Sequence, residues 1–268
     1  MSGPQYLKYG GDTTCAELET GGGEIVILDA GTGIRALGNE HIKLVSPGRT
    51  FHQLFSHAHW DHVQGFPFYK PLYAPGVTLR VYACPCSQQE IKEWLEGTMQ
   101  APFFPVALAG VGSNLIFEQW STSFKIGDLH CVSFPINHPN QGFGYRLTEG
   151  DKSIAFIPDN ELGFAHKGGL SFDEYAETLA GVDLLIHDGE YLPEEYHARF
   201  KSWGHSPYDE VVRLAQAAKV KRLLLWHTDQ DRTDEGADEL VARARRQLAD
   251  SGSDILCEAA YTGQVIEI

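Results

Sequence analysis

The chain has 268 residues, of which 43% are hydrophobic, and a formal net charge of −15 at pH 7. This length suffices for one sizeable core, so we expect a single domain over residues 1–268. The acidic excess argues against extended nucleic acid as a partner, because Lys and Arg supply most of the non-specific affinity for phosphates. No run approaches the roughly 20 apolar residues of a membrane span, and Met1-Ser-Gly-Pro lacks the charged and apolar regions of a signal peptide. We therefore expect a cytoplasmic protein without a membrane partner.

The five cysteines are an odd number at irregular spacings, which predicts reduced thiols and not a disulfide framework. Cys84-Pro-Cys86 alone resembles part of a metal site, but one such pair without a partner is a weak signal. Structural or incidental thiols are the expectation.

Hydrophobic runs predict strands along most of the chain. The first covers residues 24–29, after which Ala30-Gly-Thr-Gly33 turns the chain, with Gly31 and Gly33 supplying backbone angles that a side chain would obstruct. This turn lacks the following Lys-Ser or Lys-Thr of a phosphate-binding loop. Further strands are expected at 50–55, 78–83, 129–134, 142–147, 153–157, 183–187 and 222–226.

Helices are expected between several of these strands. The first opens at Ser87 with Glu90 as its capping-box partner, and the last spans Thr233 to Leu248. Between them, a second helix opens at Ser206, with Pro207 at the first helical position. Its inner face is predicted to carry Val211, Val212, Leu214 and Ala215. This order of elements predicts an α/β fold with sheets packed together and helices outside.

Four metal-binding side chains follow the strand at 50–55, in the segment His57-Ala-His59-Trp-Asp61-His62. Strand alternation would put His57 and His59 on one side and turn Asp61 and His62 toward a second position. Imidazoles and a carboxylate this close gain little from burial unless they are paired or bind a metal. The segment therefore predicts two metal positions.

This segment matches the HxHxDH signature of the metallo-β-lactamase superfamily. Tyr9-Gly-Gly-Asp-Thr-Thr-Cys15 and Leu28-Asp-Ala-Gly-Thr-Gly33 also resemble the opening of its phosphodiesterase branch. That branch includes ribonuclease Z and cyclic-nucleotide phosphodiesterases, among them phage enzymes of the anti-Pycsar type that destroy cyclic mononucleotide signals. The resemblance implies a four-layer αββα sandwich.

The resemblance implies three further ligands. They are His138 in Ile136-Asn-His-Pro139, Asp159 in Phe156-Ile-Pro-Asp-Asn160 and His227 at the end of a strand. The family often has Gly where Pro158 stands. The implied first site is His57, His59, His138 and Asp159, and the second is Asp61, His62, Asp159 and His227. Nitrogen and carboxylate ligands suit two Zn²⁺ ions, with Mn²⁺ as the alternative.

Two more segments resemble elements of the phosphodiesterase branch. Ser202-Trp-Gly-His205-Ser206 matches an element whose histidine faces the substrate phosphate. In the segment from Asp183 to Glu190, Asp188 stands where ribonuclease Z has the Glu that orients this histidine. Asp188 is thus either a positioning residue for His205 or a structural one. The aromatic and proline runs at 66–75 and 102–105 could line a nucleobase pocket, form a subunit contact or pack in the core.

The resemblance implies a phosphodiesterase that hydrolyses a small cyclic phosphodiester, in the first place cyclic mononucleotides to 5′-monophosphates. A metal-bridged hydroxide would attack, Asp61 would serve the catalytic metals, and His205 as imidazolium would stabilise the developing charge, with a falling rate at alkaline pH. A homodimer is expected by analogy with relatives.

Other functions remain open. One alternative is a ribonuclease Z-like tRNA 3′-end endonuclease, although no long basic, Gly-rich arm stands between His62 and His138. Another is a hydrolase of the same fold that acts on a phosphoribosyl cyclic phosphate, a lactone, a thioester or a β-lactam. The last alternative is a non-enzymatic binding module. Such a module would be expected to have lost some of the ligands, whereas all seven matched positions are filled in this sequence.

Overall fold

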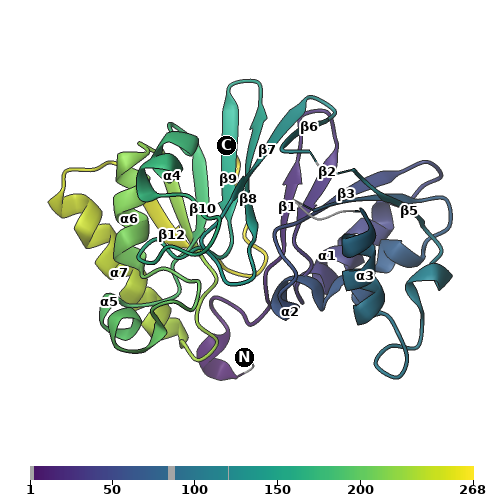
Figure 1. The fold of residues 1–268 in the computed structure, drawn as a ribbon, viewed down its shortest axis with the longest axis horizontal. Coiled ribbons are helices and arrows are strands. Elements are labelled where there is room, and N and C mark those ends of the chain that lie inside the picture. The colour runs from purple at the N-terminus through teal and green to yellow at the C-terminus, as the bar shows by residue number, and fades with distance from the viewer. Residues whose placement is uncertain (1–2, 84–87, 120) are drawn as a thin grey trace. The chain divides into compact units, whose positions relative to one another are not determined.

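The computed structural model describes residues 3–83, 88–119 and 121–268 (Figure 1). Contacts within the chain group it into two compact units, residues 12–129 and residues 1–11 with 130–268. The single domain expected from the sequence stays a prediction. The Cys84-Pro-Cys86 pair and the helix start at Ser87 lie outside the described residues. Cys15, Cys131 and Cys257 are free thiols, as expected.

The unit of residues 12–129 contains a five-stranded sheet in the order β1-β2-β3-β4-β5. Its first pair is antiparallel and the others are parallel. The strands are β1 (Ala16–Glu19), β2 (Ile25–Leu28), β3 (Thr50–Phe55), β4 (Thr78–Ala83) and β5 (Asn114–Phe117). The predicted strands at 50–55 and 78–83 are confirmed at both ends. Prediction missed β1 and β5, which are four-residue edge strands.

Short helices pack beside this sheet. They are α1 (Ile34–His41), α2 (Trp60–Val63), α3 (Gln88–Thr98) and the 3₁₀ turns Ile42–Leu44, Phe66–Phe68, Lys70–Tyr73 and Leu108–Gly110. Phe51, Phe55, Phe66, Tyr69 and Leu72 are buried together in the core of this unit. The aromatic run that starts at residue 66 therefore mainly packs in the core.

The second sheet has the order β12-β11-β10-β9-β8-β7-β6. Its strands are β6 (Ser123–Ile126), β7 (Leu129–Pro135), β8 (Phe143–Glu149), β9 (Lys152–Ile157), β10 (Leu184–Asp188), β11 (Arg222–Trp226) and β12 (Leu256–Ala259). Strands β7, β8 and β9 run antiparallel, whereas β9, β10, β11 and β12 are parallel. Parallel strands end at the same edge of a sheet, so the residues that follow β9, β10 and β11 meet there.

Helices of the second unit lie on one face of its sheet, with α6 and α7 side by side (Figure 1). They are α4 (Phe172–Thr178), α5 (Pro193–Glu195), α6 (Tyr208–Ala217) and α7 (Asp234–Asp250), with short turns at Pro4–Tyr6 and Tyr196–Phe200. The predicted inner face of α6 is buried. Pro207 is the residue before the helix and not its first helical residue, because its extended backbone lies outside the helical range. Thr233 caps α7 by accepting a hydrogen bond from the backbone N–H of Gly236, at 3.2 Å.

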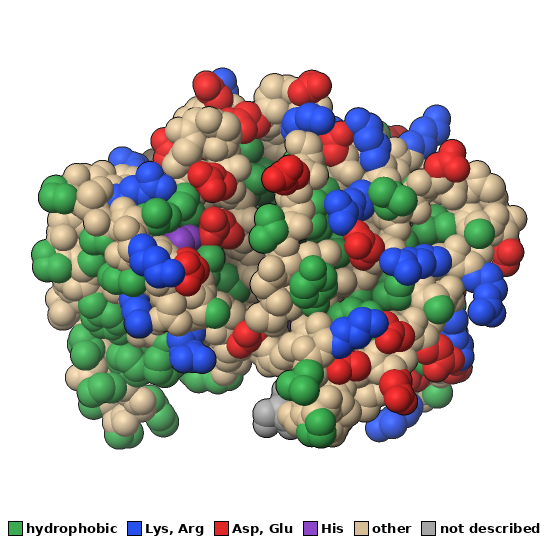
Figure 2. Space-filling view, turned by 180° about the vertical axis from the view of Figure 1, so that it is seen from behind, with side chains coloured by type: hydrophobic (Ala, Val, Ile, Leu, Met, Phe, Trp, Pro, Cys, Tyr) green, Lys and Arg blue, Asp and Glu red, His purple; other side chains and the backbone are tan. Residues whose placement is uncertain are grey.

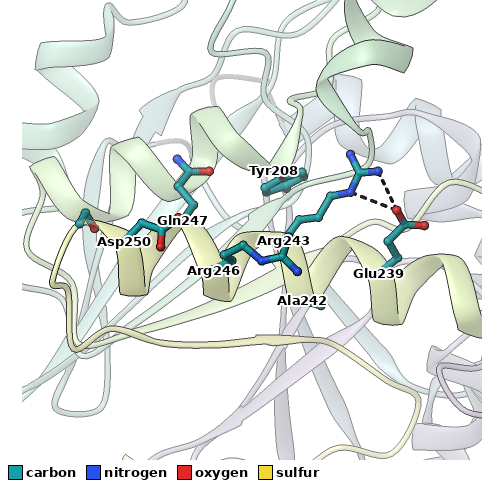
Figure 3. Close-up of a pocket in the computed structure, with 8 residues that line it drawn as sticks. Tyr208, Glu239, Ala242, Arg243, Arg246, Gln247 and Asp250 are labelled. Carbon is teal, nitrogen blue, oxygen red and sulfur yellow. Dashed lines mark hydrogen bonds and ion pairs between the residues drawn. The ribbon is translucent and has the colours of Figure 1, made fainter.

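A hollow of about 760 Å³ lies on the outer face of α7, with Tyr208 of α6 at its border (Figure 3). It is lined by polar and charged side chains, and Arg243 forms an ion pair with Glu239 there. None of the residues predicted for the functional site lines it. Among the described residues, no helix has the length and apolar character needed to cross a membrane. Each unit thus combines a mixed sheet with helices, which confirms the predicted α/β class.

Candidate functional site

The HxHxDH segment lies where β3 gives way to the short helix α2 in the unit of residues 12–129. The strand ends at Phe55 and α2 begins at Trp60, with His59 in extended conformation just before it. Strand alternation therefore does not set the geometry, contrary to expectation, and Asp61 and His62 are placed by the first turn of α2. The ring of His57 lies 4.6 Å from that of His59 and 4.2 Å from that of His62, centroid to centroid. Three imidazoles thus gather within this unit.

Asp29, which follows β2 and is fully buried, holds this group of histidines in place through hydrogen bonds. Its carboxylate accepts hydrogen bonds from the Ser56 backbone N–H at 2.7 Å, from the Ser56 hydroxyl at 2.8 Å and from Nδ1 of His62 at 2.8 Å. Since the Ser56 hydroxyl donates to Asp29, it accepts from Nδ1 of His57, 3.0 Å away. Both histidines then carry their ring proton on Nδ1, which leaves Nε2 as the nitrogen that could bind a metal. Sequence reasoning missed Asp29, although a carboxylate at the end of a buried strand was a signal.

Gly31 supports the loop that carries Asp61. A Cβ on Gly31 would stand 2.3 Å from the backbone O of Asp61 and 2.4 Å from the Thr13 hydroxyl, which itself donates to that O at 2.7 Å. Neither Gly31 nor Gly33 has a positive φ, so the predicted reason for these glycines was wrong. Space for the Asp61 loop, and not a special backbone angle, requires glycine at position 31.

Asp159 is the centre of the other group of predicted ligands, which lies in the second unit. Its Oδ2 is 3.7 Å from Nε2 of His138, and its Oδ1 is 3.6 Å from Nε2 of His227. These separations are too long for hydrogen bonds. They are close to the roughly 3.3 Å that separates two ligand atoms on one tetrahedral zinc ion with ligand distances of about 2.0–2.1 Å. Each oxygen faces a different imidazole, so this carboxylate could serve two ions.

Hydrogen bonds on the far side of both rings fix this arrangement. Nδ1 of His138 donates to the backbone O of Gly204 at 2.9 Å, and Nδ1 of His227 donates to Glu190 at 3.0 Å. Both Nε2 atoms are thereby directed toward Asp159. Gly204 has a φ of 100°, and a Cβ there would stand 2.2 Å from Nδ1 of His138. Only glycine allows this contact.

His205 lies in the same group of residues, stacked on His227 at a ring distance of 4.7 Å. Its Nε2 is 4.0 Å from Oδ2 of Asp159, and its Nδ1 is 3.1 Å from Glu190. Burial alone would lower the pKa of His205, but the negative charges of Glu190 and Asp159 outweigh it and raise the pKa to about 9. Burial alone would raise the pKa of Glu190, yet the imidazoles of His205 and His227 lower it. The protein charges thus favour a protonated His205 beside an ionised Glu190.

Asp188 and Glu190 both lie near Nδ1 of His205, at different distances. Asp188 is 3.5 Å from Nδ1 of His205 and accepts backbone N–H bonds from Asn160 at 2.8 Å and Ser206 at 3.1 Å. It therefore ties together the segments after β9 and before α6. Glu190 approaches His205 more closely, and sequence reasoning passed over it although it stands two residues away in the same segment. The catalytic assignment of Asp188 stays a prediction.

Glu161 is a second buried carboxylate that the sequence analysis missed. One of its oxygens accepts from the Ser202 N–H at 2.6 Å and from the Tyr196 hydroxyl at 2.6 Å. The other accepts from the Gly204 N–H at 2.8 Å and from Nε2 of His166 at 2.8 Å. Glu161 therefore fixes the loop that presents His205. Its partners lie up to 43 residues away in sequence, so no local pattern could have identified it.

Within each unit, then, the predicted residues lie together. His57, His59, Asp61 and His62 form one group, and His138, Asp159, Asp188, His205 and His227 form the other. Nitrogen and carboxylate donors predominate in both, and this donor set fits zinc or a similar divalent ion. Joint metal binding by the two groups stays a prediction.

Comparison with known proteins identifies the family. A family model described as a β-lactamase superfamily domain matches residues 25–228. Ribonuclease BN of Escherichia coli O7:K1 is 23% identical, in a match that covers 75% of this chain and 77% of that protein.

Three solved structures share the fold, each at 18% sequence identity. The metallo-β-lactamase fold protein YhfI from Bacillus subtilis has a TM-score of 0.67, with 95% of this chain and 92% of that chain covered. A diphosphatase from the PhnP family has a TM-score of 0.63, with 96% and 84% covered. The short form of human tRNase Z has a TM-score of 0.62, with 96% and 92% covered. The chain therefore belongs to the β-lactamase superfamily, which includes metal-dependent hydrolases, and it has the predicted metallo-β-lactamase fold.

Proposed function

We propose that the chain is a metal-dependent phosphodiesterase whose two groups of ligands jointly hold two metal ions. Asp159 carries this proposal, because its two oxygens face Nε2 atoms of different histidines at 3.7 Å and 3.6 Å. The first ion would be held by His57, His59, His138 and Asp159, and the second by Asp61, His62, Asp159 and His227. The donor set favours Zn²⁺, with Mn²⁺ as the alternative. Bound ions would supply Lewis acidity toward phosphoryl oxygens and lower the pKa of water.

His205 supports a phosphodiester as the substrate. Its Nδ1 lies 3.1 Å from Glu190, at ion-pair distance, and its Nε2 is the atom turned toward Asp159. A protonated imidazole in that position would donate to a phosphoryl oxygen or give its proton to the leaving oxygen. Asp188 would keep this ring in place through the backbone of Ser206.

The charge of the chain supports a small substrate. The formal net charge is −15, and on the face drawn in Figure 2 Lys and Arg side chains are interspersed with Asp and Glu side chains. A polynucleotide would need a broad basic surface. We therefore propose a small cyclic phosphodiester, in the first place a cyclic mononucleotide that is hydrolysed to the 5′-monophosphate.

Processing of tRNA 3′ ends is the second candidate. It is favoured by the similarity to ribonuclease BN and to human tRNase Z. Residues 63–137 contain no long basic, Gly-rich arm of the kind that ribonuclease Z uses to grip tRNA, which counts against it.

A hydrolysis panel distinguishes these substrates. Zinc-loaded and manganese-loaded protein would be offered cyclic purine and pyrimidine mononucleotides, ribose cyclic phosphate, precursor tRNA, a lactone, a thioester and a β-lactam. We expect 5′-monophosphates from the cyclic mononucleotides. Turnover of tRNA alone would replace the first candidate with the second, and turnover of only the lactone, thioester or β-lactam would remove both.

We also propose a homodimer, by analogy with relatives of this fold alone. Sedimentation velocity at micromolar concentration tests it. A monomer there would contradict it.

A further inference from the structure

Trp203 has a large aromatic side chain that is exposed to solvent. It stands two residues before His205, and 60% of its surface is exposed. Exposure of a large apolar ring is unfavourable, and exposed aromatic residues beside a reactive group often bind ligands. Its neighbour Gly204 is buried, so the chain enters the interior directly after this ring.

The backbone around Trp203 is firmly held. Ser202 and Gly204, on either side of it, donate their N–H groups to the two oxygens of Glu161 at 2.6 Å and 2.8 Å. The N–H of Trp203 itself donates to the backbone O of Phe200 at 3.1 Å. The exposure of Trp203 is therefore set by an anchored loop, which presents the ring in a defined place.

A row of aromatic rings connects Trp203 with His205. Trp203 meets Phe200 edge to face at 5.4 Å, and Phe200 stacks on Tyr191 at 4.3 Å with only 7° between the planes. Tyr191 in turn meets His205 at 6.2 Å. These contacts brace the Trp203 ring and relate its position to that of His205.

We propose that Trp203 is a specificity-determining residue that stacks on the nucleobase of the substrate while His205 faces the phosphate of the same molecule. This inference rests on the proposed function. Every base has a π face, so stacking on Trp203 tolerates different bases and favours the larger purines. Because the base takes no part in bond breaking, stacking stabilises substrate and transition state alike and acts on KM, with little effect on kcat.

The kinetic test compares a substrate that has a base with one that lacks it. For cyclic AMP, we expect Trp203→Ala to raise KM about tenfold, with kcat within about twofold, and Trp203→Phe to restore most of the affinity. For ribose cyclic phosphate, both variants should match the wild type. Equal losses on both substrates would mean that Trp203 only supports the loop, and would overturn the proposal.

A binding measurement separates this inference from the proposed function. AMP and ribose 5-phosphate would be titrated into metal-loaded protein while tryptophan fluorescence is recorded. We expect saturable quenching by AMP alone, abolished in Trp203→Phe. Quenching should persist in the control Trp94→Phe, since Trp94 of α3 packs against the core of its own unit, residues 12–129. Quenching that survives in Trp203→Phe, or none in the wild type, would overturn the role of Trp203 whatever the enzyme hydrolyses. If quenching depends on Trp203 but the protein does not hydrolyse cyclic nucleotides, Trp203 still binds a base and the proposed function is wrong.

Discussion

Glu190 lies 3.1 Å from Nδ1 of His205, and the same oxygen lies 3.0 Å from Nδ1 of His227. One buried carboxylate thus orients both the predicted proton donor and a predicted metal ligand. The arrangement couples the position of His205 to that of His227. Groups of this kind beyond the metal ligands often decide metal affinity and activity.

Replacement of Glu190 by Gln keeps the size of the side chain and removes its charge. We expect kcat to fall by about 10- to 100-fold, because His205 loses the charge that favours its protonated form and His227 loses an orienting partner. The measurement is kcat at saturating metal, with metal content determined in parallel. The matched control is Glu194→Gln, at an exposed glutamate that pairs with Arg243. Equal kcat for both variants and the wild type would refute the role of Glu190.

Replacement of His205 by Ala removes the predicted proton donor without removing a predicted metal ligand. Turnover should fall by about 10²- to 10⁴-fold, the usual contribution of such a group. Metal content should stay that of the wild type. A variant that retains full turnover would remove His205 from the mechanism.

Asp29→Asn tests whether the buried carboxylate orients the histidines predicted to bind metal. It weakens the hydrogen bonds to His62 and Ser56, so the affinity for metal should fall by about 10- to 100-fold. Equilibrium dialysis with zinc measures this directly. The idea fails if Asp29→Asn binds zinc as tightly as the wild type does.

The pH dependence of stability is predicted at Asp183, in the second unit. Burial would raise the pKa of this carboxyl, but Lys221 and Ser153 outweigh it and lower the pKa below its usual value. A lowered folded-state pKa means that the stabilisation is fully present above the unfolded-state pKa of about 3.9 and is lost as the pH falls through the folded-state value. Asp183→Asn should therefore cost about 1 kcal/mol at pH 7, with a difference from the wild type that shrinks toward pH 3. Urea unfolding at several pH values measures it, and a difference that grows on acidification would contradict the assignment.

The sequence predicted much of the fold, because strands and helices leave local patterns. It also singled out seven candidate metal ligands, four from one local segment and three from the family resemblance, and metal binding by them stays a prediction. Strand β11 carries a continuous apolar run after Arg222, and β4 alternates buried with half-buried residues; the bounds of both, and of β3, agree with prediction. Strands β1, β5, β6 and β12, which prediction missed, have four residues each and lack the continuous apolar run that marks the equally short β2. Glu161 and Glu190 act through partners brought together by tertiary structure. For the same reason, the sequence could not show that Gly31 is needed for the close approach of the Asp61 backbone, which lies 30 residues further along the chain.

The most direct test is the turnover of cyclic AMP by the zinc-loaded protein, with the product identified by chromatography. We predict that the wild type forms 5′-AMP and that this activity is lost after a chelator removes the metal. No hydrolysis of any cyclic mononucleotide, together with cleavage of precursor tRNA by the same preparation, would contradict it.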